Sequence, residues 1–573
     1  MKTENKRTFI KVLAFALISI ATPLFSHINA QQAAAPKWVS KAQKSIVSVV
    51  TYDKEGNMLH SGTGFYIASN GIAMADYGLF KGAYSAVVVD MNGEKSNVER
   101  ILGADDTYAL VRFKTANKKA TPLSIAASTP SRDAMVFAVN FSKDKISQCP
   151  SATVADIKLV NEDIPYYSLS YATGAEYLGA PLFNSNGDLI GTIQPSLNAS
   201  GYAIGIKFAD KLIIQALSTK ANNLALEKIH IKKGLPDTAE ESLVYLYVKS
   251  RNTPNEEYVD MLNLFIETYP DNAEGYYRRA TPYTDMCRFD DADNDLQTYL
   301  KLSEDKALAN SKIADAIHTK LVYQPTPEYD KWNFDVALDY INKALAEKPD
   351  NFEFKLLKTQ ILMSKKDYDS AIEIYDEINN SDLRSPATLY ASSLAHGGRG
   401  DSVNVQIELL DSAISLFGNP LPAEAANYIL QRGRLFANSE RYREAVQDYN
   451  QYCYLCNNKV SDVFYYDRAQ LESNGKMYQQ ALEDLNTAIS MSPRTPLYYI
   501  EKGGLLLRVN QIDESITTLQ QALQLAPNAV DAYRMLGYAQ IQKGDKVNGK
   551  KNLEKAVELG DENAQSLIDK YAK

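Results

Sequence analysis

Alternating apolar and polar positions, typical of half-buried β-strands, run through the first third of the chain. Residues 46–52 (IVSVVTY) are β-branched and aromatic, and similar short runs recur at 85–90, 134–139 and 189–193. Asn-Gly pairs, which favour the tight turns of β-hairpins, lie between several of these runs. Many short strands divided by turn residues predict an all-β barrel or sandwich domain over residues 37–218.

Beyond residue 238 the apolar positions take a helical spacing, and the spacing repeats along the chain. The small residues Ala488, Ala522 and Ala556 follow one another at intervals of 34. Small residues let two helix axes approach closely, while larger neighbours fill the groove beside them. The period predicts an all-α solenoid of about eight or nine helical hairpins over residues 238–571, with 306–317 as an insertion.

The 34-residue period resembles that of the tetratricopeptide repeat. Residues 528–559 carry Tyr533, Leu536-Gly537 and Ala556 in the pattern of that repeat. The resemblance implies a scaffold that binds other proteins or peptide segments along a concave face lined by the first helices of the hairpins. Each polar or aromatic residue on those helices is either a partner contact or a packing residue, and the candidates are Tyr276, Arg279, Tyr283, Asn427, Arg434, Tyr465, Arg468, Tyr498 and Lys502.

The N-terminal segment resembles the trypsin-like serine proteases of the HtrA/Deg family. Residues 61–67 (SGTGFYI) are similar to the family's strand before the catalytic His, and residues 179–191 (GAPLFNSNGDLIG) to the segment after the catalytic Ser. The order and spacing of these motifs agree with the family. The resemblance implies a trypsin-like double β-barrel over 37–218, followed by a linker over 219–237 and then the solenoid.

The positions that match the family's catalytic triad hold residues of the wrong chemistry. The His position falls at Gly78, the Asp position at Thr107 and the Ser position at Leu178. A serine protease needs a hydroxyl that a His base activates and an Asp that orients the base. Glu176 also stands where the family has a Gly of the oxyanion loop, and its charge would repel the oxyanion. We therefore expect no enzyme activity from this degenerate protease domain.

A relocated catalytic site is the alternative. His60 is the one His of the barrel region, and Ser168 and Ser170 are the serines closest to the matched Ser position. His60 with either Ser168 or Ser170 would make a serine-type endopeptidase. No Gly-x-Ser-Gly turn surrounds either serine, which favours the protein-binding scaffold.

The first 30 residues have the features of an export signal. Lys2, Lys6, Arg7 and Lys11 precede an apolar run over residues 12–25, for which an uncleaved membrane anchor is the alternative. Ala30 offers the small residue at which a signal peptidase would cleave. Cleavage there predicts a periplasmic or secreted protein. No later apolar stretch reaches the roughly 18 residues of a membrane span, so none is expected in the mature chain. The net charge of −9 disfavours nucleic acid as a partner.

Four cysteines are few for an exported chain of this length. Cys453 and Cys456 have the spacing of a redox or metal motif, but no second Cys pair and no nearby His completes a zinc site. They are either buried thiols or a local disulfide. Phosphate-loop and dinucleotide motifs are also missing from the sequence, so we expect neither a metal nor a cofactor.

Overall fold

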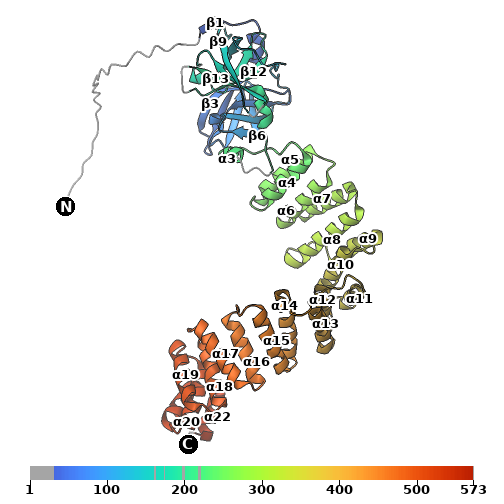
Figure 1. Cartoon of the computed structure of the whole chain (residues 1–573), viewed down its shortest axis with the longest axis vertical. Helices are drawn as coiled ribbons and strands as arrows, with labels where there is room; N and C mark the ends of the chain where they lie inside the picture. The colour runs from blue at the N-terminus through green and yellow to red at the C-terminus, as the bar shows by residue number, and fades with distance from the viewer. Residues whose placement is uncertain (1–30, 161–162, 173, 197–199, 217–220, 572–573) are drawn as a thin grey trace, which may run out of the picture. The chain divides into compact units, whose positions relative to one another are not determined.

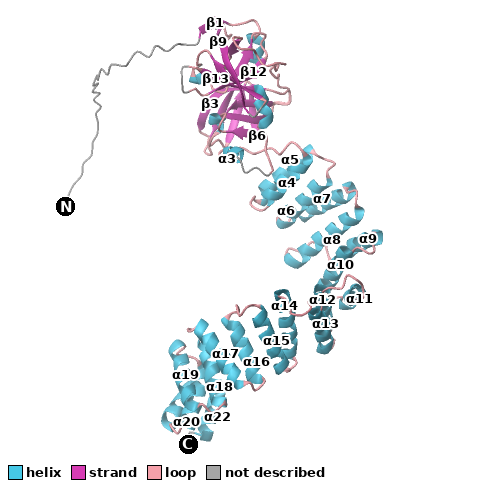
Figure 2. Cartoon of the chain, viewed as in Figure 1, coloured by secondary structure: helices cyan, strands magenta, loops and turns pink. Residues whose placement is uncertain are grey.

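The computed structural model describes residues 31–573 except 161–162, 173, 197–199, 217–220 and 572–573 (Figure 1). The predicted signal peptide lies outside the described residues. The chain divides into two compact units, Met1–Leu302 and Ser303–Lys573. Among the described residues, strands occur only in the first unit, and the second is built of helices (Figure 2).

Six antiparallel strands close the first barrel in the order β2-β3-β4-β7-β6-β5. Apolar side chains at alternate strand positions fill its interior, and Val47, Val49 and Phe113 are fully buried there. The strands predicted at 46–52 and 85–90 are present. The bounds are β2 (Ile46–Tyr52), β3 (Met58–Tyr66), β4 (Ile72–Asp76), β5 (Ser85–Val89), β6 (Lys95–Asp105) and β7 (Leu110–Thr115).

The second barrel is a sheet of order β1-β9-β10-β13-β12-β11-β8 that closes because β8 also pairs with β9. Tyr167, Leu182 and Ile193 are buried in its core. The two barrels confirm the predicted trypsin-like double barrel. The bounds are β1 (Gln31–Ala34), β8 (Met135–Ala138), β9 (Gln148–Val160), β10 (Ile164–Leu169), β11 (Pro181–Asn184), β12 (Leu189–Gln194) and β13 (Gly201–Gly205).

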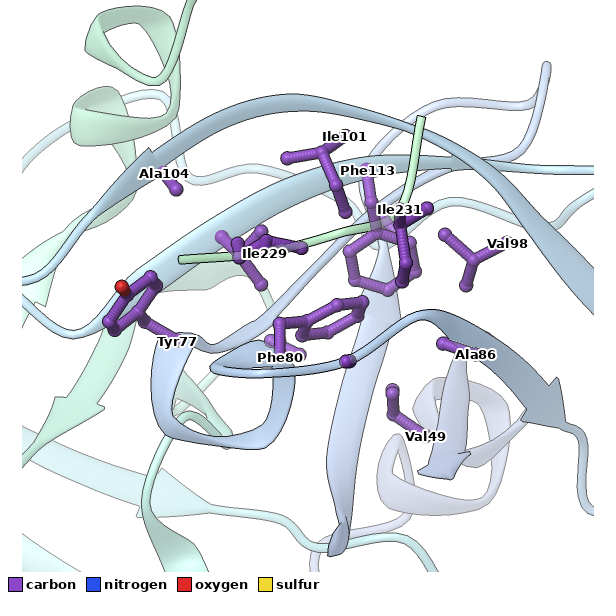
Figure 3. Packing of buried hydrophobic residues seen from close by; sticks show 14 of the residues in the cluster. Val49, Tyr77, Phe80, Ala86, Val98, Ile101, Ala104, Phe113, Ile229 and Ile231 are labelled. Atoms are coloured by element: carbon purple, nitrogen blue, oxygen red, sulfur yellow. The ribbon is translucent and has the colours of Figure 1, made fainter. Parts of the chain in front are cut away.

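Much of the segment predicted as a linker is part of the first barrel. After helix α3 (Ala221–Glu227), the chain buries Ile229 and Ile231 in the hydrophobic cluster that fills this barrel (Figure 3). The N–H of Ile101 on β6 donates to the carbonyl of Lys232 at 2.8 Å, so the segment is also bonded to the barrel backbone. The barrel domain therefore continues well past 218, which corrects the predicted boundary.

Two helical hairpins complete the first unit. Helix α4 (Ala239–Ser250) pairs with α5 (Asn255–Thr268), and α6 (Ala273–Asp285) pairs with α7 (Phe289–Leu302). Tyr245 of α4 joins the core cluster of the first barrel. The first hairpin is thus packed on the barrel, and the compact unit ends at Leu302 rather than at the predicted boundary of 238.

The second unit is an array of helices that pair in chain order. Ala371, Ala488, Ala522 and Ala556 are fully buried, which confirms that the small residues mark close helix approaches. A Cβ added to Gly503 would lie 2.5 Å from Leu519 Cγ, so a larger residue does not fit there.

Residues 306–317, predicted as an insertion, belong instead to α8, which pairs with α9. Across the described residues, no helix combines the length and apolar character needed to cross a membrane. The bounds are α8 (Lys306–Tyr323), α9 (Phe334–Glu347), α10 (Phe352–Lys365), α11 (Tyr368–Asn379), α12 (Pro386–Arg399), α13 (Val403–Ser415), α14 (Ala426–Asn438), α15 (Tyr442–Leu455), α16 (Asp462–Asn474), α17 (Tyr478–Met491), α18 (Pro496–Arg508), α19 (Ile512–Leu525), α20 (Val530–Gln542), α21 (Lys546–Glu558) and α22 (Glu562–Tyr571).

Candidate functional site

Three segments that carry the matched triad positions meet where the two barrels touch. The N–H of Tyr77 donates to the carbonyl of Ala109 at 2.9 Å, which joins the start of α2 (Tyr77–Phe80) to the loop between β6 and β7. A Cβ added to Gly179 would lie 2.6 Å from the amide nitrogen of Asp76, so the loop before β11 rests on the end of β4. The fold therefore brings the three positions onto neighbouring segments, as a trypsin-like site requires.

The residues at these positions make local backbone bonds. The N–H of Gly78 donates to the carboxylate of Asp76 at 2.7 Å, and the N–H of Thr107 donates to that of Asp105 at 2.9 Å. Gly78 and Thr107 are exposed, and Leu178 is half-buried. A Gly offers no base, a Thr no charge to orient one, and a Leu no nucleophile.

The loop at the oxyanion position uses its amide internally. It forms the 3-10 helix η2 (Ala175–Tyr177), and the N–H of Leu178 donates to the carbonyl of Ala175 at 3.2 Å. In a serine protease the N–H at the nucleophile position faces the substrate oxygen. Asn140 Nδ2 donates to the carbonyl of Glu176 at 2.8 Å and holds this turn. The role of Asn140 could not be predicted from the sequence, because the carbonyl that it binds belongs to a residue 36 positions away.

The residues of the relocated-site alternative lie on different barrels. His60 is exposed on β3 and lies near Asp76. Burial raises the pKa of the Asp76 carboxyl, and the charge of His60 acts against that rise. Ser168 is on β10 of the second barrel, and Ser170 Oγ, just beyond it, accepts the N–H of Thr153 at 2.9 Å. Within the part of the chain that the structure describes, no hydrogen bond joins His60 to either serine.

The nine candidate contacts of the repeats differ in exposure. Tyr283 and Tyr498 are buried, and the Tyr498 hydroxyl donates to Asp462 at 2.9 Å, so both pack within the repeats. Asn427 and Arg434 are exposed and open to a partner. Five others are half-buried: Tyr276, Arg279, Tyr465, Arg468 and Lys502.

Two of the candidate arginines belong to an arrangement that recurs in three hairpins, which we call the arginine clamp. An Arg on the first helix makes two hydrogen bonds of 2.6–2.9 Å to an Asp 16 residues later on the second helix. The same guanidinium also donates to a polar side chain on the last helix of the preceding hairpin. The clamps are Arg279–Asp295 with Asn263, Arg432–Asp448 with Asp411, and Arg468–Asp484 with Asn450.

Glu472 lies beside the third clamp without full hydrogen bonding. It is 3% exposed, and among the described residues its Oε2 has no hydrogen-bond partner. Burial, together with the charge of Asp484, raises the pKa of Glu472 to about 8, although Arg468 opposes the rise. The carboxyl therefore stays largely protonated near neutral pH.

Replacing Glu472 with Gln is expected to flatten the pH dependence of the array's stability. Between its ordinary pKa of 4.5 and about 8, Glu472 holds a proton only in the folded state. The stabilising contribution of Glu472 is therefore complete below the lower value, falls by about 1.4 kcal/mol per pH unit between the two values, and is lost once the pH has risen through the upper one. Urea unfolding at about pH 5, 6.5 and 8 measures this. Equal slopes in both proteins would contradict it.

Cys453 and Cys456 are free thiols at the end of α15. Cys453 is buried, and its Sγ donates to Asn458 Oδ1 at 3.4 Å. The structure thus has free thiols rather than a local disulfide, and of the two only Cys453 is buried while Cys456 is half-buried. In the described ranges, no group of three or more His, Cys, Asp or Glu side chains is placed to hold a metal ion.

Family models match both halves of the chain. The model for a trypsin-like peptidase domain matches residues 62–191. A tetratricopeptide repeat model matches 332–392, and a TPR repeat model matches 503–544. A serine endoprotease from Yersinia pestis is a similar solved structure, with 20% identity, coverage of 30% of this chain and 62% of that chain, and a TM-score of 0.27.

Curated relatives are similar to this chain over part of their length. The DnaJ protein P58IPK homolog A of Oryza sativa subsp. japonica is 24% identical over 303 residues, which cover 49% of this chain and 61% of the relative. The Hsp70-Hsp90 organizing protein of Triticum aestivum is 21% identical over 231 residues, or 35% of this chain and 39% of the relative. The chain thus spans less than two thirds of the length of either relative.

Proposed function

We propose that this chain, a trypsin-like peptidase domain joined to an array of tetratricopeptide repeats, is an exported protein-binding scaffold whose trypsin-like domain performs no catalysis. The observation that carries the proposal is the bond from the N–H of Leu178 to the carbonyl of Ala175 at 3.2 Å. The bond takes up the N–H that would face the substrate oxygen, and the Leu178 side chain offers no hydroxyl as a nucleophile. Gly78 and Thr107 supply neither a base nor an orienting carboxylate.

The domain lacks the triad side chains and the oxyanion donor at the nucleophile position together. A protease that lacks its triad keeps a residual rate gain of about 10³–10⁴, which comes from the oxyanion hole and substrate binding. Here the oxyanion donor at position 178 is bonded within the turn as well. The usual gain of at least about a millionfold is then out of reach.

Incubation of the purified mature chain with casein tests this part of the proposal. We expect casein to remain intact over a day, with active trypsin as the positive control. Cleavage that disappears on His60→Ala, but not on a change of the exposed Lys228, would instead support the relocated endopeptidase site.

Protein binding is assigned to the repeats, because stacked hairpins present a continuous concave surface to a partner segment. The relative from Triticum aestivum is named as an organizing protein of Hsp70 and Hsp90, and such a role in protein assembly supports a protein-binding function for the repeats of this chain. Asn427 and Arg434 of α14 are exposed, which supports them as partner contacts, and Arg residues often anchor interfaces.

Capture from envelope extract tests this assignment. Asn427→Ala with Arg434→Ala is expected to weaken capture of the main partner about tenfold or more. The matched control is Gln447→Ala, an exposed residue on α15 of the same hairpin. Both variants should keep the wild-type circular dichroism spectrum. Unchanged capture by the double variant, with loss on deletion of the barrels, would assign binding to the barrels instead.

Export rests on the basic and apolar pattern of residues 1–30. Cleavage after Ala30 would leave β1 whole, since that strand begins at Gln31. Mass spectrometry of the protein recovered from a secreting host is expected to find Gln31 as the first residue. Recovery of the full-length chain from the cytoplasm would contradict the proposal.

A further inference from the structure

A cavity of about 300 Å³ lies where the first helical hairpin packs on the first barrel. Its walls come from β6, residues 214–216, the chain between Leu226 and Lys233, α4 and α5. All of these segments belong to the first compact unit. The volume is at the lower end of the range of small-molecule sites in proteins.

The cavity has an apolar side. Ile214, Ile229 and Tyr245 are buried residues of the barrel core whose outer atoms reach the cavity wall. Val248 of α4 and Met261 of α5 add further apolar surface. Such a wall favours the hydrocarbon part of a ligand over water.

One carboxylate of the cavity is already neutralised. Asp260 of α5 accepts from Arg100 of β6 at 3.2 Å and from Lys232 at 3.0 Å. These three side chains form a closed cluster with two cations on one anion. Glu227 and Glu257 also line the cavity, so its four cations face three carboxylates and leave one positive charge in excess.

The other cations of the cavity have no such partner. Lys233 Nζ donates to the carbonyls of Ile229 and Ile231 at 2.5 and 2.6 Å, and Lys249 Nζ lies 5.6 Å from the ring centroid of Tyr245. Within the described residues, neither ammonium group forms an ion pair with a carboxylate.

Lys233 and Lys249 also repel each other. Burial and, after it, the charge of Lys249 lower the pKa of Lys233 to about 8, and Glu257 opposes this only in part. Two ammonium groups that face one cavity without an ion pair are stabilised when an anion enters between them.

We propose that this cavity binds a small organic anion, with a carboxylate or phosphate group against Lys233 and Lys249 and an apolar body against Val248 and Met261. The site goes beyond the protein-binding role, because its ligand is a small molecule held between the first hairpin and the barrel. Lys233 belongs to the barrel segment and Lys249 to α4, so a bound anion also ties the first hairpin to the barrel.

Titration calorimetry on the full mature chain tests the site with three probes of equal chain length: octanoate, octyl phosphate and 1-octanol. We expect at least one anion to bind, and 1-octanol to bind at least about tenfold more weakly, because only the anions satisfy the two lysines. The stronger anion tells a carboxylate ligand from a phosphate ligand. No binding of either anion, or equal binding of the alcohol, would overturn the proposal.

Variants place the binding in the cavity. Lys233→Met and Lys249→Met are each expected to weaken anion binding about tenfold or more. The matched control is Lys228→Met, in the same segment but outside the cavity and paired with Asp106 at 3.6 Å. Lys249 is exposed, so its variant decides the question even if Lys233→Met does not fold. Wild-type affinity in Lys249→Met would overturn the site, whatever the capture experiment shows for the repeats.

Discussion

Replacing Asp484 with Ala is expected to destabilise the repeat array by about 3–5 kcal/mol, because the half-buried guanidinium of Arg468 loses both of its hydrogen bonds to a carboxylate and keeps only the more distant Glu472, at 3.9 Å. Asp484 is 7% exposed, and it accepts two hydrogen bonds from Arg468 at 2.6 and 2.7 Å. Removing one partner of a buried pair costs more than the intact pair contributes, since the remaining charge has lost its water as well as its partner.

Two further variants distinguish the loss of the ion pair from a general loss of stability on mutation. Arg468→Met combined with Asp484→Leu removes both charges and should recover much of the stability. Asp513→Ala breaks the exposed pair with Lys543, which should change stability by less than about 1 kcal/mol. Urea unfolding followed by circular dichroism measures all three. If Asp484→Ala unfolds at the same midpoint as Asp513→Ala, the clamp contributes nothing to the array.

Replacing Ile229 and Ile231 with Ala is expected to destabilise the first barrel by roughly 2–5 kcal/mol for each residue. Both side chains are buried in the barrel core, in the cluster with Phe80 and Phe113 (Figure 3). Each substitution leaves a space that the packed barrel fills only in part. In calorimetry, the transition of the first unit should move to lower temperature.

The second unit serves as the internal control for that experiment. Residues 303–573 form their own compact unit, so their transition should stay where it is. The fragment 303–573 should also fold alone with a strongly helical spectrum. If the double variant melts like the wild-type chain, Ile229 and Ile231 do not pack in the barrel core as described.

The architecture could be predicted because its signals repeat. Alternation over several strands identifies a barrel, and small residues at a period of 34 identify the hairpins. The stretch from Ile229 to Ile231 has only two apolar positions, too few to show a period. Its role depends on the cluster it enters, most of whose residues lie more than 100 positions earlier in the chain.

The sequence predicts where the candidate site lies in the fold, but not the hydrogen bonds that surround it. The motif spacing places Gly78, Thr107 and Leu178 on segments that do meet in the fold. The bond between the Leu178 amide and the Ala175 carbonyl depends on backbone conformation, which residue types alone do not specify. For the arginine clamps, the 16-residue spacing can be seen in the sequence. The sequence does not show, however, whether Arg468 contacts a partner or forms an ion pair inside the hairpin.

Labelling of the mature chain with a fluorophosphonate probe tests the central claim, a trypsin-like domain without catalysis, most directly. The probe reacts with a serine only when a base activates its hydroxyl. We expect no labelled serine by mass spectrometry under conditions in which trypsin is fully labelled. Label on Ser168 or Ser170 that His60→Ala abolishes would contradict the claim and show that the domain is an active hydrolase.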